Sequence, residues 1–200
     1  KNKEFKLKKK FNLTYPAFLN FRILNSIIIK FLNKMIFFVS PHKKIIYKNI
    51  QDYFYPLDKI NYWNRIYGKE GFMQYQCAIP EGNIEFILYV FNFLKINKIR
   101  SYLAVLKRFG NSNNGYISFP LKGWTLALDF PDHDLRNDMI FKMLDKELVK
   151  IGGRLYLAKD NVNNSMEFLK TTYPNFQKWK LIKNRMDPKS IFCSDIYQSN

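Results

Sequence analysis

The stretch Trp124-Thr-Leu-Ala-Leu-Asp-Phe130 alternates bulky apolar residues with small or polar ones. Successive side chains of a β-strand point to opposite faces of a sheet, so this pattern predicts a strand with two unlike faces. The bulky face holds Trp124, Leu126, Leu128 and Phe130, and the other face holds Thr125, Ala127 and Asp129. We expect the bulky face to pack against helices and the second face to border a pocket or another polar surface.

The segment that follows predicts a helix that covers this strand. Its apolar residues recur at helical spacing, and they are Leu135, Met139, Ile140, Met143, Leu144, Leu148 and Ile151. Asp132 or Asp134 can cap the start of this helix, and the pair Gly152-Gly153 can end it. Residues 154–158 then predict a short strand.

Further strands and another helix precede this segment. Residues 72–79 and 102–109 predict strands, and alternation in the first of them puts Gln74 and Gln76 on one face. Residues 83–96 are apolar on almost every side and predict a well-buried helix between the two strands. Because the loops around the strand at residues 124–130 are short, antiparallel pairing of the strands is favoured. The predicted fold class is α+β, with helices on one face of a mainly antiparallel sheet.

The two ends of the chain have less regular patterns. Residues 16–39 predict helical or irregular structure without a clean period. Aromatic and aliphatic residues at 45–55 predict a strand that Pro56 ends. Residues 163–184 predict helical pieces that are interrupted at Pro174.

Composition excludes two classes of protein. The chain has 200 residues, of which 47% are hydrophobic, and this apolar content excludes a largely disordered chain. The apolar run from Ile23 to Val39 contains Lys30 and Lys34, so it does not predict a membrane span. Attachment to a membrane surface stays open.

The chain is strongly basic, with a formal net charge of +17. Such an excess fits binding to nucleic acid, to anionic lipid or to an acidic substrate. Lysine is spread along the whole chain, however, which favours a biased composition and a solvated surface over a dedicated polyanion site. Cys77, Cys193, His42 and His133 form no paired motif and predict neither a disulfide framework nor a metal site.

A series of short motifs carries a resemblance to a known family. In chain order they are Tyr55-Pro56-Leu57-Asp58, Trp63-Asn64-Arg65, Tyr67-Gly68, Gly71-Phe72-Met73-Gln74-Tyr75-Gln76, Leu106-Lys107-Arg108-Phe109-Gly110, Ser118-Phe119-Pro120, Gly123-Trp124, Asp129-Phe130-Pro131, Gly152-Gly153-Arg154-Leu155-Tyr156-Leu157-Ala158-Lys159-Asp160, Tyr173-Pro174, Asp187-Pro188 and Ser194-Asp195. In this order they closely resemble the decaprenylphosphoryl-β-D-ribose oxidases. These are FAD-linked oxidases of the vanillyl-alcohol oxidase superfamily, related to the D-arabinono-1,4-lactone oxidases. The resemblance is dense from about Tyr47 to Asp195.

The resemblance implies two parts of the chain. Residues 11–152 would be the substrate-binding domain, truncated at its N-terminus, and residues 153–200 would be the segment that returns to complete the FAD-binding domain. Most contacts to FAD would then come from an absent N-terminal domain, so we expect the isolated chain to be inactive. A truncated gene, a split gene and an incomplete sequence would each produce such a chain.

The resemblance assigns three residues to the cofactor side of the site. Lys159 matches the family's lysine near the flavin and the sugar, and it is the candidate catalytic residue as well as a cofactor-binding one. A lysine that is desolvated beside a flavin can act as a base, and a charged one can stabilise a developing alkoxide or reduced flavin. Tyr156 matches a tyrosine that contacts the flavin, and Ala127 would lie close to it. Without the resemblance, Lys159 is a surface lysine at the end of a strand.

Four residues are implied to bind the substrate. Gln76 and Lys107 match residues that line the family's pocket, and Tyr55 matches a tyrosine at the pocket rim. Thr125 stands where the family commonly has Asn, and Ala127 stands where it commonly has Cys, so the substrate preference stays open. Without the resemblance, Lys107 is a solvated edge residue and Tyr55 is a core residue.

The function implied by the resemblance is the oxidation of a sugar secondary alcohol, in a polyprenyl-phosphoryl pentose or a relative, by hydride transfer to FAD. An aldonolactone oxidase is an alternative with the same chemistry. A non-catalytic basic module for anionic lipid or nucleic acid is an alternative from another class. The oxidase would have the N-terminal FAD-binding domain, the sugar substrate and a short-chain reductase as partners, without nucleic acid or metal. Its location would be the cytoplasm or a membrane surface.

Overall fold

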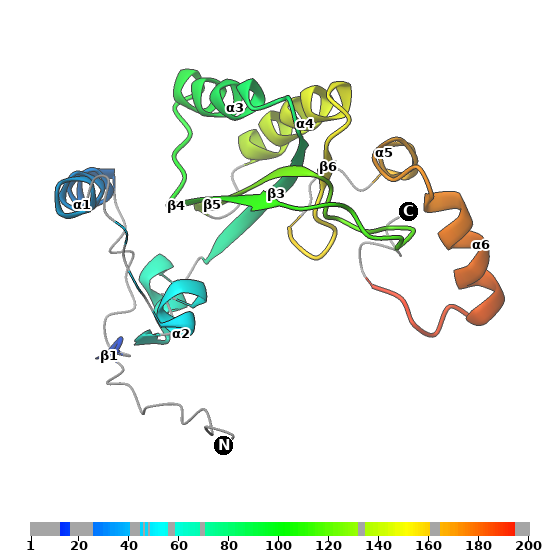
Figure 1. Cartoon of the computed structure of the whole chain (residues 1–200), viewed down its shortest axis with the longest axis horizontal. Helices are drawn as coiled ribbons and strands as arrows, with labels where there is room; N and C mark the ends of the chain where they lie inside the picture. Colours follow the sequence, from blue (N-terminus) through cyan, green and yellow to red (C-terminus); the bar gives the residue numbers. More distant parts are fainter. Residues whose placement is uncertain are drawn as a thin grey trace. The chain divides into compact units, whose positions relative to one another are not determined.

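A computed structural model describes residues 13–16, 26–40, 45, 47, 49–55, 59–68, 71–131, 135–160 and 165–194. The chain divides into two compact units, Lys1–Gly71 and Phe72–Asn200, and each is described by itself. Figure 1 shows the elements of both units. The expected division between residues 152 and 153 stays a prediction.

The first unit contains short elements. Strand β1 (Leu13–Thr14) pairs in parallel with β2 (Ile60–Asn61). Helix α1 spans Ser26–Val39, so the helical prediction for this region is confirmed there, while residues 17–25 lie outside the described residues. A 3-10 helix spans Trp63–Tyr67.

The strand predicted for residues 45–55 is wrong, because helix α2 (Ile50–Phe54) occupies this region. The Tyr53 amide donates to the Asn49 carbonyl oxygen at 3.0 Å, a helical hydrogen bond. Ile50, Tyr53 and Phe54 stand three and four residues apart, and this spacing puts them on one side of a helix. A run of apolar residues this short does not discriminate between strand and helix.

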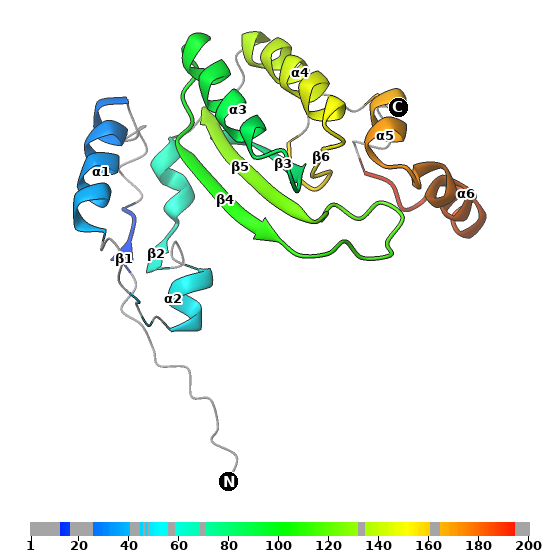
Figure 2. The ribbon, with the colours of Figure 1, turned by 45° about the horizontal axis from the view of Figure 1, so that its top comes forward.

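The second unit is built on a four-stranded sheet in the order β4-β5-β3-β6. The strands are β3 (Phe72–Pro80), β4 (Leu103–Phe109), β5 (Gly123–Pro131) and β6 (Arg154–Leu155). Every neighbouring pair is antiparallel, which confirms the predicted α+β class with a mainly antiparallel sheet. Figure 2 shows the long strands β4 and β5 side by side.

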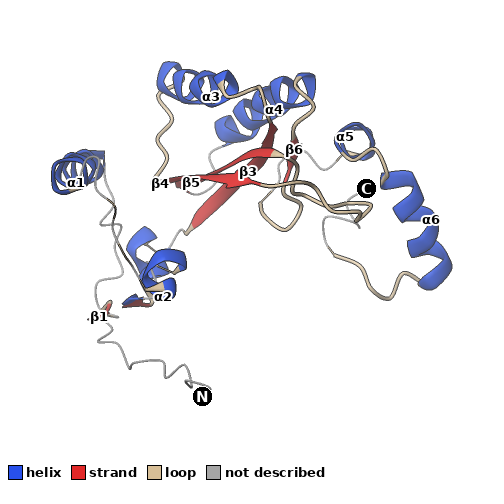
Figure 3. Ribbon diagram, viewed as in Figure 1, coloured by secondary structure: helices blue, strands red, loops and turns tan. Residues whose placement is uncertain are grey.

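Two helices, α3 (Glu85–Ile96) and α4 (Leu135–Lys150), lie on the same face of this sheet (Figure 3). The core between the helices and the sheet consists of Met73, Tyr75, Cys77, Ile79, Phe86, Ile87, Val90, Leu94, Leu126, Leu128, Phe130, Phe141, Leu144, Leu148, Leu155 and Phe168. Burying this apolar surface is the main stabilising contribution to the unit. The bulky face of β5 therefore packs as predicted.

Helix α3 is not buried on every side, contrary to the prediction. Phe86 and Val90 are buried, but Leu88 and Phe91 are 64% and 43% exposed. The physical reason is that α3 belongs to an outer layer, so only the side that faces the sheet is covered in this unit.

Helix α4 ends as its glycine pair predicts. Gly152 has a positive φ of 71°, which a residue with a Cβ rarely adopts. Its amide donates to the Val149 carbonyl oxygen, and the Gly153 amide donates to that of Leu148, both at 2.9 Å. These two bonds form a Schellman motif, which satisfies the last carbonyl groups of the helix. The predicted caps Asp132 and Asp134 lie outside the described residues.

The C-terminal part contains two helices, α5 (Met166–Thr172) and α6 (Phe176–Met186). The predicted interruption at Pro174 is confirmed. The Ser165 side chain caps α5 by accepting a hydrogen bond from the Phe168 amide. Within the part of the chain that the structure describes, no helix combines the length and the apolar character needed to cross a membrane.

The two cysteines differ in accessibility, and this predicts their reactivity. Cys77 is fully buried and Cys193 is exposed, and neither forms a disulfide. Burial, with Asp145 nearby, raises the pKa of Cys77 to about 12, so its thiol stays protonated and unreactive up to alkaline pH. A thiol-specific chromogenic reagent should therefore label one cysteine per chain rapidly in the native state and the second only in denaturant. Rapid labelling of both native thiols would show that β3 is not packed as described.

Candidate functional site

On the face of the sheet that is turned away from α3 and α4, β3 and β5 carry small and polar side chains, and β4 adds Leu103, Val105 and Phe109 beside Lys107. Gln76 of β3 lies opposite Ala127 of β5, and Thr125 of β5 lies opposite Lys107 of β4. Residues directly opposite each other in an antiparallel pair share a face, so the register places these four predicted site residues on one face. We call it the polar face.

Gln76 is held by a hydrogen bond across the polar face. Its Nε2 atom donates to Oγ1 of Thr125 at 3.1 Å. Thr125 is only 1% exposed, so this hydroxyl has almost no access to solvent. This bond orients the side-chain amide of Gln76, whose oxygen Oε1 can accept a hydrogen bond from a ligand. Opposite Gln76, the methyl group of Ala127 leaves space above the sheet.

A second polar pair lies further along the same face. Nε2 of Gln74 donates to Oδ1 of Asp129 at 2.6 Å, and Asp129 is 2% exposed. A buried carboxylate without partners is costly, so the amide of Gln74 offsets part of the cost of burying this charge. Sequence alternation predicted that Asp129 shares a face with Thr125 and Ala127, but it gave no indication of the Gln74 partner.

Lys107 is exposed on β4, which is the edge strand of the sheet. Its position opposite Thr125 gives the long side chain access to the space above the polar face. This placement is equally compatible with the solvated edge residue that sequence context indicated.

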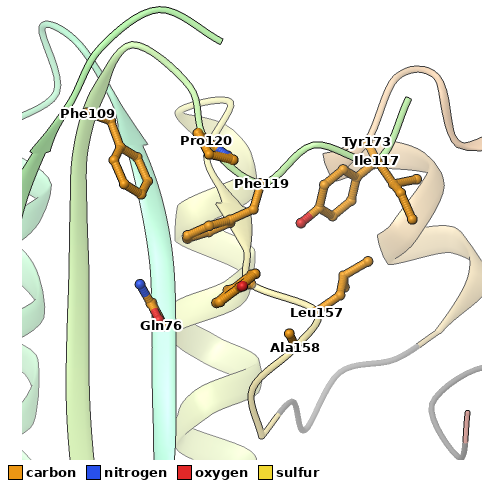
Figure 4. A pocket seen from close by; sticks show the side chains of 9 residues that line it. Gln76, Phe109, Ile117, Phe119, Pro120, Leu157, Ala158 and Tyr173 are labelled. Atoms are coloured by element: carbon orange, nitrogen blue, oxygen red, sulfur yellow. The ribbon is translucent and has the colours of Figure 1, made fainter. Parts of the chain in front are cut away.

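A pocket of about 500 Å³ opens beside β6, next to Gln76. It is lined by Gln76, Phe109, Ile117, Phe119, Pro120, Tyr156, Leu157, Ala158 and Tyr173 (Figure 4). The Phe119 and Tyr156 rings stack in it with centroids 4.4 Å apart and planes inclined by 20°. The Tyr156 amide donates to the backbone carbonyl oxygen of Gln76 at 2.9 Å, which fixes this wall of the pocket against β3. Two predicted site residues, Gln76 and Tyr156, therefore line one pocket.

Arg154 and Tyr173 join three segments beside the pocket, which are the loop at Ser118, strand β6 and the end of α5. Nη1 of Arg154 donates to the Ser118 carbonyl oxygen at 2.8 Å, and its guanidinium carbon lies 5.3 Å from the centre of the Tyr173 ring. The Tyr173 hydroxyl donates to the Leu155 carbonyl oxygen. Burial raises the pKa of Tyr173, which keeps the hydroxyl protonated as a donor, and burial lowers the pKa of Arg154.

Replacing Tyr173 by phenylalanine should lower the free energy of unfolding by about 1–3 kcal/mol, because the buried Leu155 carbonyl group loses its donor. Urea unfolding followed by circular dichroism measures this difference. The control is Tyr116→Phe, since Tyr116 is 44% exposed; we expect a change within about 0.5 kcal/mol there. Equal stability of the two variants would show that the Tyr173 hydroxyl does not join these segments.

Lys159 lies in a turn rather than at the end of a strand. Strand β6 ends at Leu155, so the strand predicted for residues 154–158 is too long. The Lys159 amide donates to the Tyr156 carbonyl oxygen at 3.1 Å, which closes the turn. A two-residue pairing with β3 suffices to direct the chain into this turn. Lys159 is partly buried, and its neighbour Ala158 lines the pocket.

Tyr55 is the predicted site residue that lies outside the second unit. It lies in the first unit, where it is 59% exposed and its ring is tilted against that of Phe54 with centroids 6.4 Å apart. The core position that sequence context suggested is therefore wrong within this unit. Its role at the pocket rim stays a prediction.

Apart from Tyr156, sequence reasoning gave no role to the aromatic and aliphatic residues of the pocket wall. Phe119 and Tyr173 lay within motifs of the resemblance, but their contacts with Tyr156 and Leu155 join segments distant in the sequence. No local pattern reports such contacts. Among the described residues, no group of three or more His, Cys, Asp or Glu side chains is arranged to hold a metal ion.

Comparison with known proteins connects this chain to two kinds of oxidase. Residues 126–200 match the model of the D-arabinono-1,4-lactone oxidase family. The chain is 34% identical over 149 residues to the decaprenylphosphoryl-β-D-ribose oxidase of Mycolicibacterium smegmatis, covering 74% of this chain and 32% of that protein. It is 31% identical over 127 residues to an uncharacterised Streptomyces coelicolor protein of the mprA 5′ region, covering 64% of this chain and 34% of that protein. The chain thus spans about a third of the length of these relatives.

Proposed function

Because this chain belongs to the oxidase family of the decaprenylphosphoryl-β-D-ribose and D-arabinono-1,4-lactone oxidases, we propose that it forms the substrate-binding part of an FAD-dependent oxidoreductase. The substrate would be a sugar with a secondary alcohol, in a polyprenyl-phosphoryl pentose or a relative. The observation that carries the proposal is the placement of Gln76, Thr125, Ala127 and Lys107 on one polar face. The Tyr156 pocket and the Lys159 turn adjoin this face through β3.

Each residue of the site would have a different role. The side-chain oxygen Oε1 of Gln76, oriented by Thr125, would accept a hydrogen bond from a sugar hydroxyl. Lys107 would hold an anionic or polar group at the open edge of the sheet. The amine of Lys159 would take up the proton of the reacting hydroxyl while the hydrogen on the same carbon leaves as a hydride. FAD, when bound, supplies the acceptor for that hydride and its two electrons.

The shape and chemistry of the pocket fit a planar ring system. Its walls are largely aromatic and aliphatic, and Gln76 contributes a polar group at one side. The small side chain of Ala158 leaves the backbone of the Lys159 turn accessible to such a ring. Tyr156, stacked on Phe119, and Ala158 would therefore contact the flavin, together with the predicted cofactor residues Lys159 and Ala127. Because the matched residues cover only 32% and 34% of these relatives, we place most FAD contacts on an FAD-binding domain outside this chain.

An aldonolactone oxidase is the second candidate within the same chemistry. The match of residues 126–200 to the D-arabinono-1,4-lactone oxidase model favours it. The similarity to the Mycolicibacterium smegmatis enzyme covers a larger share of the chain and favours the polyprenyl-phosphoryl sugar. A short-chain reductase would be the further partner in that case.

A basic module for anionic lipid or nucleic acid is the candidate from another class. The net charge of +17 favours it. In the second unit, however, exposed lysines occur on elements as different as β4, α4 and α6. Basic side chains are therefore not confined to one element, which weakens the case for a dedicated polyanion site.

Amide chemical shifts of the isotope-labelled chain test the proposal without the rest of the enzyme. Titration with a water-soluble, short-chain polyprenyl-phosphoryl pentose should shift the amides of Gln76, Thr125 and the turn at Lys159. A Thr125→Val variant, which loses the hydrogen bond to Gln76, should weaken these shifts. Shifts spread over surface lysines that disappear as salt is raised would instead support the basic module.

A further inference from the structure

The turn that carries Lys159 is attached to β3 at both of its ends. At the first end, the Tyr156 amide donates to the backbone carbonyl oxygen of Gln76 at 2.9 Å. At the second end, the Gln74 amide donates to Oδ2 of Asp160 at 2.8 Å. The two attachment points stand two residues apart on β3, so Lys159 is held between two fixed points.

The Asp160 carboxylate takes the place of a further residue of β6. Paired residues of β6 and β3 are limited to Leu155 with Cys77 and Arg154 with Ala78. Further along β3, the outward-facing amide of Gln74 therefore lacks a backbone partner from β6. The carboxylate supplies the acceptor, and a charged acceptor forms a stronger hydrogen bond with an amide than a neutral one does.

The same Gln74 also belongs to the polar face. Its side chain donates to Asp129 of β5, while its backbone amide donates to Asp160. The position of the Lys159 turn is thus connected through one residue to the face that carries Gln76 and Thr125. A displacement of the turn would change the distance between Lys159 and a ligand held on that face.

We propose that Asp160 is a positioning residue, whose carboxylate fixes the Lys159 turn relative to the polar face. The catalytic consequence rests on the proposed function, while the attachment itself does not. With one attachment removed, the turn is free to pivot about Tyr156. In an enzyme, a displacement of about 1 Å can reduce the rate by roughly 100-fold even when binding is maintained.

Two variants of Asp160 separate the hydrogen bond from the charge. Asp160→Ala removes the acceptor, whereas Asp160→Asn retains an acceptor oxygen and removes the charge. In this chain, hydrogen exchange of the Gln74 amide should become roughly tenfold faster or more in Asp160→Ala and should stay close to the original rate in Asp160→Asn. Glu167→Ala, which removes an exposed carboxylate from α5, is the matched control and should leave this exchange unchanged.

The second measurement uses the flavin-containing enzyme that includes this chain. Asp160→Ala should lower the limiting rate of flavin reduction by roughly 10- to 100-fold with little change in substrate affinity, and Asp160→Asn should restore most of the rate. Unchanged exchange at Gln74, or unchanged flavin reduction despite faster exchange, would overturn the proposal. If Lys159→Ala also left flavin reduction unchanged while exchange at Gln74 responded as expected, the catalytic role of Lys159 would be at fault, and the attachment of the turn would stand. If the substrate did not reduce the flavin of the unaltered enzyme at all, the proposed function would be at fault.

Discussion

Replacing Lys159 by alanine should slow flavin reduction by the substrate on the order of 10²–10⁴-fold, the usual contribution of a positioned acid–base group. The reason is that no other described amine lies in the turn beside Tyr156, so the proton of the reacting hydroxyl would lose its acceptor. Stopped-flow measurement of the oxidised flavin under anaerobic conditions gives this rate. Lys170→Ala, which removes an exposed lysine from α5, should leave the rate unchanged.

A second substitution distinguishes the two roles open to Lys159. Lys159→Arg retains a positive charge, but a guanidinium does not give up its proton near neutral pH and so cannot act as a base. If Lys159 is the base, the arginine variant should be about as slow as the alanine variant. If it stabilises developing negative charge, the arginine variant should recover much of the rate. A normal rate in Lys159→Ala would reject both roles.

Replacing Gly123 by alanine should destabilise the second unit by more than about 3 kcal/mol or prevent it from folding. Gly123 has a φ of +148°, a conformation that residues with a Cβ rarely adopt. An added Cβ would overlap the Ile79 carbonyl oxygen, and it would lie 2.7 Å from the Glu81 nitrogen and 2.8 Å from the Pro80 carbonyl carbon. All three neighbours are backbone atoms, so no side chain can rotate to relieve the clash.

The control for this substitution is Gly110→Ala. Gly110 has no positive φ, and a Cβ added there would meet nothing within 4 Å. We expect its unfolding free energy to stay within about 0.5 kcal/mol of the original. Urea unfolding followed by circular dichroism compares the two variants. Similar stability of both would contradict the close approach of β5 to the end of β3, and with it the register that places Thr125 and Ala127 beside Gln76.

The parts of the fold that were predictable from the sequence are those with a long, regular pattern. Strand β5 and helix α4 follow from apolar periodicity, because a buried face imposes its period on the residues that form it. The glycine pair at Gly152 marked the end of α4 for a local conformational reason. Residues 50–54 lacked enough length for the period to show, and the strand expected there is a helix.

The candidate site was less predictable, because its contacts join distant segments. The polar face of β5 followed from alternation, but its partners Gln74 and Gln76 depend on the strand register. The Arg154–Ser118 bond spans 36 residues, and the Gln74–Asp160 bond spans 86. Tertiary folding alone decides such pairs. The family resemblance pointed to Lys159, whereas the structure adds the turn that holds it and Asp160 as its second attachment.

The central claim is that this chain supplies the substrate side of a flavin site. The most direct test mixes the flavin-containing enzyme that includes the chain with a polyprenyl-phosphoryl pentose in the absence of oxygen and follows the absorbance of the oxidised flavin. We predict that this absorbance is lost in a single turnover while one equivalent of the keto sugar forms. Loss of absorbance with an aldonolactone but not with the pentose would identify the lactone oxidase. Unchanged absorbance with both compounds would contradict the account.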